Sequence, residues 1–350
     1  MAMRKFLTSV LLMAAAVTAA PAGKYTEGDR SRSEICIVTT ITLTAASTYT
    51  ATIPAATPFT PTGTATYPGT PVPKPGHPKG HKNSSSSLPG ISYAPYRADH
   101  QCKTKEQIKD DLSQLSGSYS LLRIYGTDCD QVPNVYSCAK NSGMKLFLGI
   151  WDLEDVQAEA QRIIDGIDGD WEIVSTVSVG NELVNNGAAS LAKVLSAVKQ
   201  ARKILRAAGY QGPVVTVDTF IAADANPELC TESDYCAVNA HAFFDGTSSA
   251  EDAGKWLSNT VKSLKSKLPS DKRVVICETG WPSKGNPNGL AIPGLSEQKV
   301  AIAAIKEAFA DHLDDIILFS AFNDPWKKEE SATFNAEPYW GINGATSSSD

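Results

Sequence analysis

Several features that mark other protein classes are missing from this 350-residue sequence. It has no CxxC pair and no His/Cys cluster, so the ligand spacing of a zinc site is absent. No Gly-rich GxGxxG loop follows the first strand-like segment, as a dinucleotide-binding fold would require. After the N-terminal region, no apolar run is long enough for a membrane helix. These absences argue against a zinc protein, a dinucleotide-binding protein and a multi-span membrane protein.

Basic charge is scarce in the larger part of the chain. The net charge is −6, but residues 1–88 hold 8 Lys and Arg against 3 Asp and Glu, so residues 89–350 carry a balance of −11. An acidic domain repels phosphate backbones, which excludes nucleic acid as the expected partner. A neutral ligand fits this charge better.

The seven cysteines fit an oxidising compartment. Their odd number leaves at least one thiol free or paired between chains. Cys230 and Cys236 could close a small loop, whereas the spacing of Cys102, Cys129 and Cys138 leaves their pairing open.

Residues 1–19 have the pattern of a secretory signal peptide, because two basic residues precede an apolar run from Phe6 to Val17 and small residues follow. An apolar N-terminal helix is the alternative. The polar tail, residues 344–350, lacks the hydrophobic stretch of a GPI signal. We therefore expect a secreted, extracellular, monomeric protein without a membrane anchor after signal cleavage.

Residues 20–88 are dominated by Thr, Pro, Ser and Ala. Such a segment cannot bury enough apolar surface to offset its ordering entropy, so we expect a disordered, O-glycosylated stalk. A short strand-like run, EICIVTTITLT, is the one exception within it. Asn83 lies in an NSS sequon and is the expected N-glycosylation site. A stalk of this kind suggests association with a cell wall or matrix.

From residue 89 to residue 343, strand-like apolar runs alternate with amphipathic helices. Eight such runs are present, with one short irregular connection after Thr219. Several are apolar throughout, as parallel strands covered on both faces are. Eight units in about 260 residues match an α/β fold of the (β/α)8 TIM-barrel type, and a doubly wound open sheet is the alternative.

Polar and aromatic residues end these strands, where a TIM barrel has its active site. Glu182 ends the fourth strand, in VGNELVNNG, and Glu278 ends the seventh, in ETGWPSKG. Either glutamate alone could be a solvated strand end, but together they supply the two carboxyl groups of a retaining glycosidase. The ring of strand-end residues suits a sugar cleft and comprises Tyr93, Tyr96, Arg123, Tyr125, Trp151, Asn181, Asp218, Asn239 to Phe244, Trp281, Asn323, Asp324 and Trp326.

Four motifs, in order along residues 90–342, resemble glycoside hydrolase family 17, the β-1,3-glucanases. VSVGNE and ETGWP are similar to the family's acid/base and nucleophile motifs, and LLRIYG to its second-strand motif. FNDPWK is similar to the last strand of fungal wall glucanases and glucanosyltransferases. The resemblance implies a (β/α)8 barrel, retention of configuration and no metal or organic cofactor. It assigns the acid/base role to Glu182 and the nucleophile role to Glu278.

The resemblance also implies residues that bind substrate. Asn181 would bond the 2-hydroxyl of the sugar being cleaved, and Tyr125 would fix the orientation of Glu278. Tryptophans after the seventh and eighth strands would stack on sugar rings, and two phenylalanines stand where plant relatives usually have Tyr. The expected substrate-binding set is Tyr93, Tyr125, Asn181, Phe243, Phe244, Trp281, Asn323, Asp324 and Trp326.

Strand alternation gives two predictions of local geometry. Regular alternation would place Asn181 and Glu182 on opposite sides of the sheet, so we expect a bulge from Gly180 to Glu182. The same alternation turns Cys277 toward the helix layer if Glu278 faces the barrel axis, as a packed core thiol.

Two other residues keep two interpretations each. Arg123 either orients a carboxylate or pairs with a neighbour, and His241 either lines the cleft or is a satisfied core histidine.

The predicted activity is β-1,3-glucan hydrolysis by a two-glutamate double displacement. The same residues would transglycosylate if a glucan replaced water as the acceptor. A non-catalytic, wall-bound glucan-binding protein is the alternative from another class, but it would not need both glutamates.

Overall fold

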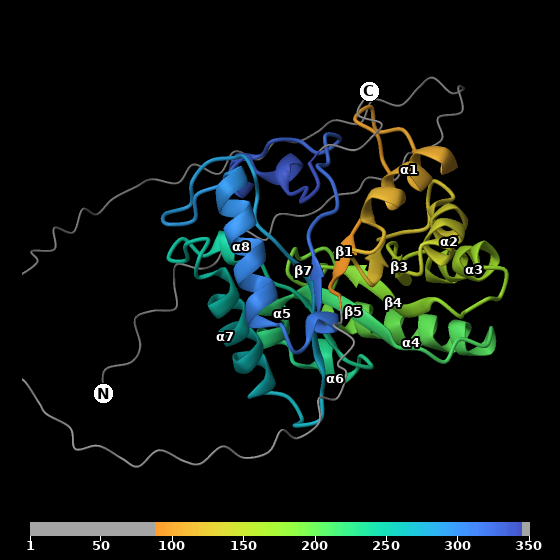
Figure 1. Ribbon diagram of the computed structural model, residues 1–350. Coiled ribbons are helices and arrows are strands. Elements are labelled where there is room, and N and C mark those ends of the chain that lie inside the picture. Colours follow the sequence, from red (N-terminus) through yellow and green to blue (C-terminus); the bar gives the residue numbers. More distant parts are fainter. Residues whose placement is uncertain (1–87, 345–350) are drawn as a thin grey trace, which may run out of the picture. The chain divides into compact units, whose positions relative to one another are not determined.

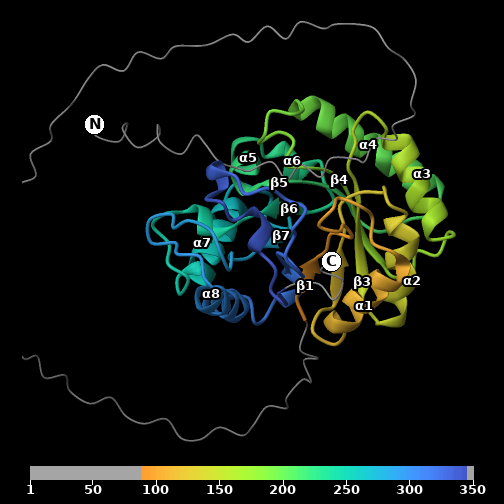
Figure 2. The ribbon, with the colours of Figure 1, turned by 90° about the horizontal axis from the view of Figure 1, so that it is seen from above.

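Eight parallel strands close into a barrel in chain order, with β1 beside β8 (Figure 1). The computed structural model describes residues 88–344. In Figure 2, α1 to α4 lie along one side of the barrel and α7 and α8 along the other. This arrangement confirms the (β/α)8 prediction. The predicted signal peptide, the stalk, Asn83 and most of the polar tail lie outside the described residues.

The strands supply the barrel wall and the helices cover it. The strands are β1 (Gly90–Ser92), β2 (Leu121–Arg123), β3 (Lys145–Ile150), β4 (Val174–Asn181), β5 (Val214–Thr219), β6 (Cys236–Asn239), β7 (Val274–Thr279) and β8 (Ile316–Leu318). The helices are α1 (Lys105–Leu115), α2 (Gln131–Asn141), α3 (Val156–Gly166), α4 (Leu191–Ala207), α5 (Phe220–Ala225), α6 (Glu228–Thr231), α7 (Ala253–Lys265) and α8 (Leu295–Ala308).

Side chains of the strands divide between two apolar layers. One cluster includes Phe147, Val215, Ala237 and Ile317, which come from four strands, and it contains no helix residue. It therefore fills the barrel. The alternate strand residues pack with the helices in a larger cluster. The continuous apolar runs of the sequence reflect this burial on both faces.

Two strands depart from regular pairing next to the predicted glutamates. In β4, Ser178 pairs with Val215 but Asn181 pairs with Val217, so β4 carries one extra residue there. This confirms the bulge predicted for Gly180 to Glu182.

In β7, Val238 pairs with Ile276 but Asn239 pairs with Glu278, which leaves Cys277 as the extra residue. Cys277 belongs to the cluster inside the barrel. The prediction that it faces the helix layer was wrong, because a bulge places two consecutive side chains on one face.

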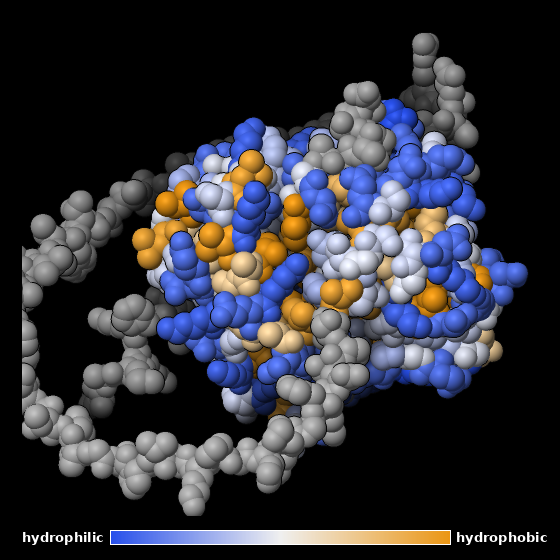
Figure 3. Space-filling model, in the orientation of Figure 1, coloured by the Kyte–Doolittle hydropathy of each residue, from blue (hydrophilic) through white to orange (hydrophobic). Residues whose placement is uncertain are grey.

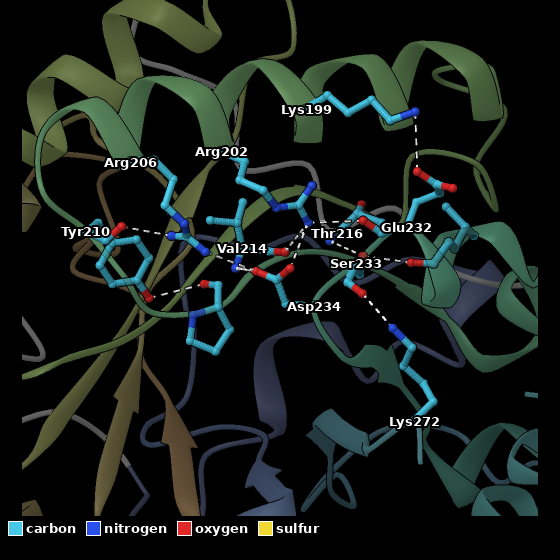
Figure 4. Close-up of polar contacts among 12 residues, drawn as sticks. Lys199, Arg202, Arg206, Tyr210, Val214, Thr216, Glu232, Ser233, Asp234 and Lys272 are labelled. Carbon is cyan, nitrogen blue, oxygen red and sulfur yellow. Dashed lines mark hydrogen bonds and ion pairs between the residues drawn. The ribbon is translucent and has the colours of Figure 1, made fainter. Parts of the chain in front are cut away.

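A polar network holds the N-terminal end of β5 (Figure 4). Asp234 accepts a hydrogen bond of 2.7 Å from the Val214 N–H and forms ion pairs with Arg202 (3.2 Å) and Arg206 (3.5 Å). Ser233 accepts a bond of 3.0 Å from the Thr216 N–H. The network connects α4 to the entry of β5 and β6, far from the strand ends that carry the glutamates.

Four of the cysteines form two disulfides. Cys230 and Cys236 are bonded, as the sequence suggested, and Cys102 is bonded to Cys129. Among the described residues, Cys138 and Cys277 are free and buried.

The described surface has a few exposed apolar side chains. Leu290, Ile292 and Leu295 are more than half exposed, and Figure 3 shows apolar residues gathered on the side of the barrel where α7 and α8 lie. None of the helices in residues 88–344 combines the length and apolar character of a membrane span.

Candidate active site

Glu278 ends β7 inside the mouth of the barrel, where it is 2% exposed. Arg123 Nη1 donates to Glu278 Oε1 at 2.9 Å, and the Tyr125 hydroxyl donates to the same oxygen at 2.9 Å. His241 Nε2 lies 3.5 Å from the other oxygen, Oε2. Arg123 therefore orients a carboxylate, and Tyr125 lies beside Glu278 as predicted.

These neighbours fix the charge of Glu278. Burial works to raise its pKa, but Arg123, His241 and Tyr125 outweigh burial and hold the pKa below its usual value. Glu278 is thus ionised near neutral pH, as a nucleophilic carboxylate must be.

The close approach of Tyr125 depends on a glycine in the next strand. A Cβ at Gly149 would lie 2.2 Å from the Tyr125 carbonyl oxygen. No other residue fits there without moving the backbone that carries the Tyr125 ring.

Glu182 follows the bulge of β4 and is 6% exposed. Its backbone has φ 55°, in the left-handed region, two residues after Gly180 at φ 76°. This conformation costs a non-glycine residue about 1 kcal/mol or more. Asn239 donates to Glu182 Oε1 at 2.9 Å. Burial first, then the charges of Glu278 and Asp218, raises the pKa of Glu182 to about 8.

A continuous set of hydrogen bonds connects the two glutamates. Arg123 donates to Asn181 Oδ1 at 2.8 Å as well as to Glu278, and Asn239 donates to Asn181 Oδ1 at 3.2 Å as well as to Glu182. The bulge brings Asn181 and Glu182 into this set together. The pair has one ionised and one protonated member, which is the division of roles that acid–base catalysis with two carboxyl groups requires.

A pocket opens beside Tyr125, between the ends of β1, β2, β3 and β8. Trp326 meets Tyr96 edge to face at 5.2 Å, and its Nε1 donates to Asp324 Oδ1 at 3.1 Å. The pocket thus has aromatic walls with carboxylate and hydroxyl groups between them, which suits a sugar. Its lining includes Ser92, Tyr93, Tyr96, Tyr125, Gln131, Trp151, Phe319, Asp324, Trp326 and Lys327.

Other residues of the expected substrate-binding set lie elsewhere. Trp281 and Phe243 are 0% exposed and pack against each other at 5.4 Å, which leaves no ring face for a sugar. Asn323 Oδ1 accepts from the Gly341 N–H at 2.9 Å and so holds the C-terminal segment. Phe244 is partly exposed beside His241.

Sequence reasoning missed a buried ion cluster. Lys327 lies 3.4 Å from Asp324 and 3.6 Å from Glu337, and its side chain is 8% exposed. Its ammonium group also lies 4.9 Å from the centroid of the Phe319 ring. The signal in the sequence was the lysine at the end of FNDPWK, which directly follows Trp326.

His241 lies between Glu278 and a group of buried aromatic rings. Its ring meets Phe319 and Trp340 at 5.4 and 4.9 Å, and within the described residues its buried Nδ1 has no hydrogen-bond partner. In residues 88–344, no group of three or more His, Cys, Asp or Glu side chains could hold a metal ion.

Comparisons with known proteins agree with this geometry. A family profile described as the BtgE/BtgC glycoside hydrolase domain matches residues 90–341. The cell surface mannoprotein MP65 of Candida albicans is 45% identical over 260 residues, which cover 74% of this chain and 67% of that protein. The probable family 17 glucosidase SCW4 of Saccharomyces cerevisiae is also 45% identical over 260 residues, covering 74% and 66%. The match to SCW4 thus spans less than two thirds of that relative, and part of each relative lies outside the matched region.

Two solved structures share the fold. A glycoside hydrolase family 17 β-1,3-glucanosyltransferase from Rhizomucor miehei has a TM-score of 0.64 at 21% identity, covering 76% of this chain and 97% of that one. An endo-laminarinase from Formosa has a TM-score of 0.62 at 20% identity, covering 74% and 84%. The chain belongs to the BtgE/BtgC family of glycoside hydrolases, within glycoside hydrolase family 17.

Proposed function

We propose that this protein cleaves β-1,3-glucan with retention of configuration, using Glu278 as the nucleophile and Glu182 as the acid/base. The observation that carries the proposal is a pair of buried glutamates at the barrel mouth, joined by one hydrogen-bonded set, whose neighbours shift their pKa values in opposite directions. The family membership and the activities named for the two structural relatives, a β-1,3-glucanosyltransferase and an endo-laminarinase, support β-1,3-glucan as the substrate.

The first half of the reaction forms a glycosyl-enzyme. Glu182 gives its proton to the glycosidic oxygen, and a Glu278 oxygen attacks the anomeric carbon as the bond to the leaving sugar breaks. Oε1 already accepts bonds from Arg123 and Tyr125, so Oε2 is the oxygen that attacks. Oδ1 of the Asn181 side chain already accepts from Arg123 and Asn239, which leaves the side-chain Nδ2 to bond the 2-hydroxyl.

The second half releases the sugar. Glu182, now ionised, takes a proton from the acceptor, whose oxygen attacks the anomeric carbon and frees Glu278. Water as acceptor gives hydrolysis, and a glucan hydroxyl gives a longer chain. The pocket lined by Tyr93, Trp151 and Trp326 would hold one part of the glucan.

We also propose that the protein is secreted and wall-directed. The predicted signal peptide, the Thr/Pro/Ser-rich stalk with Asn83 and the surface location in the name of the Candida relative support this location.

Product analysis on a reduced laminari-oligosaccharide tests the activity. Purified protein is compared with Glu278→Gln, and with Glu172→Gln as a matched control, because Glu172 is an exposed carboxylate just before β4. Shorter products that disappear only in Glu278→Gln identify a hydrolase, and longer products identify a glucanosyltransferase. Folded wild-type protein that gives no product would contradict the proposal and favour a glucan-binding protein.

A further inference from the structure

The backbone that presents Glu182 is held by a residue outside the hydrogen-bonded pair. Glu182 has a left-handed φ of 55°, and the chain turns immediately after it, with the Asn186 N–H donating to the Glu182 carbonyl at 3.0 Å. A strained conformation persists only where the surroundings hold it in place. A neighbouring group must therefore hold this turn.

Asp218, in the neighbouring strand β5, holds the turn by hydrogen bonds to its backbone. Its Oδ2 accepts from the Val184 N–H at 2.9 Å, and its Oδ1 accepts from the Asn185 N–H at 3.2 Å and the Thr219 N–H at 2.9 Å. Two of these three donors are the second and third residues after Glu182. The Thr219 hydroxyl adds a bond of 2.9 Å to the Asn185 side chain.

The Asp218 carboxylate has no compensating cation. It is 1% exposed, and in the described part of the chain no Lys, Arg or His forms an ion pair with it. Its three partners are all N–H donors, the pattern that an ionised carboxylate accepts. Burial raises the pKa of Asp218, and these three N–H groups oppose that rise.

We propose that Asp218 is a positioning residue for Glu182, clamping the strained turn that presents it and placing an uncompensated negative charge behind it. The inference rests on the proposed role of Glu182 as the acid/base. The cap of α5 is supplied by the Thr219 hydroxyl, which accepts from the Ala222 N–H at 3.1 Å, so the Asp218 carboxylate is not needed for that helix.

The negative charge of Asp218 is one of several groups around Glu182 that shift its pKa. Burial, Glu278 from β7 and Asp218 from β5 raise the pKa of Glu182, while the Asn239 amide from β6 and Arg123 from β2 lower it. Removal of the Asp218 charge therefore lowers the pKa of Glu182. A residue that served only packing would not move it.

The pH dependence of kcat/KM on a reduced laminari-oligosaccharide tests the inference. For Asp218→Asn we expect the alkaline limb to move down by about one pH unit and the maximum rate to fall about tenfold as the turn loosens. Asp234→Asn is the matched control, since Asp234 also accepts a backbone N–H, at the other end of β5. The control should leave the limb in place.

Two more variants separate charge from folding. Asp218→Glu keeps the charge, so its limb should stay near that of the wild type although its rate falls. Asp218→Ser removes the charge but still accepts one N–H, and it serves if Asp218→Asn does not fold.

An alkaline limb that stays in place in both Asp218→Asn and Asp218→Ser would overturn the inference while leaving the proposed function intact. Inactive wild-type protein would instead contradict the proposed function.

Discussion

The two ends of strand β5 use the same device for different purposes. At the N-terminal end, Asp234 holds a backbone N–H and is neutralised by Arg202 and Arg206 near the surface (Figure 4). At the C-terminal end, Asp218 holds backbone N–H groups of the turn after Glu182, but no cation within residues 88–344 forms an ion pair with it. The first arrangement holds α4 to the base of the barrel, whereas the second leaves a negative charge beside the candidate acid/base. This contrast agrees with the general division of TIM barrels into a stability face and an active face.

Substitution of Arg123, at the mouth of the barrel, and of Arg202, at its base, should give the largest difference in stability. Arg123→Met would leave the buried Glu278 carboxylate without its cation, so we expect a loss of about 3–5 kcal/mol in unfolding free energy. Arg202→Met removes a partly exposed pair and two bonds to carbonyl groups, with an expected loss of about 1 kcal/mol. Urea denaturation at neutral pH measures both. Equal losses of unfolding free energy in the two variants would show that buried charges at the mouth contribute no more to stability than the charges at the base.

The two disulfides offer a second comparison. The bond Cys102–Cys129 closes 27 residues and Cys230–Cys236 closes 6, so their Ser pairs should lose about 3 and 2 kcal/mol. Only the first should also raise KM severalfold, because Cys102 pairs with Tyr96, a wall of the pocket. Steady-state kinetics alongside thermal unfolding separates the two effects. An unchanged KM in the first pair would mean that the pocket wall holds without its crosslink.

The raised pKa of Glu182 should lower the unfolding free energy of the protein at alkaline pH. Its pKa is raised from 4.5 to about 8 in the folded protein, so the folded state keeps a proton that the unfolded state loses, and stability falls as pH rises through this window. Glu182→Gln does not titrate, and its stability relative to wild type should therefore rise by about 4 kcal/mol between pH 4.5 and 8.

The control for that experiment is Glu172→Gln, at the other end of β4. Glu172 is an exposed carboxylate, so this variant measures the effect of replacing a glutamate by glutamine away from the barrel mouth. Denaturation curves at several pH values give both differences, and a flat difference for Glu182→Gln would show that Glu182 is ionised in the folded state.

The smallest effect on stability is expected at the exposed edge of the polar network that holds the N-terminal end of β5. Lys199 pairs with Glu232 at 3.3 Å, and both side chains are well exposed. Lys199→Ala should change the unfolding free energy by less than about 0.5 kcal/mol. A larger loss would mean that the network in Figure 4 acts as one cooperative unit.

The sequence predicted those parts of the site that follow from strand order. Apolar runs located the eight strands, and the motifs placed Glu182 and Glu278 at two strand ends that meet at one mouth. The requirement that Asn181 and Glu182 face the same side of the sheet also predicted the bulge in β4. These features depend on local pattern and on the geometry of parallel strands alone.

Features set by neighbouring loops were not predictable in this way. Cys277 was misplaced because a second bulge, in β7, breaks the alternation that the argument assumed. Trp281 and Phe243 were expected at the surface of the cleft, but loops from distant parts of the chain bury them. Lys327 was missed because its partner Glu337 lies beyond the last strand. Each case depends on tertiary contacts that the local sequence does not encode.

The pH dependence of kcat/KM for the wild-type protein tests the central claim most directly. Since Glu278 must be ionised and Glu182 protonated, the account predicts a bell with an acid limb below pH 4.5 and an alkaline limb near pH 8. A rate that still rises with pH beyond 8 would contradict it, because Glu182 would then act in its ionised form in the first step.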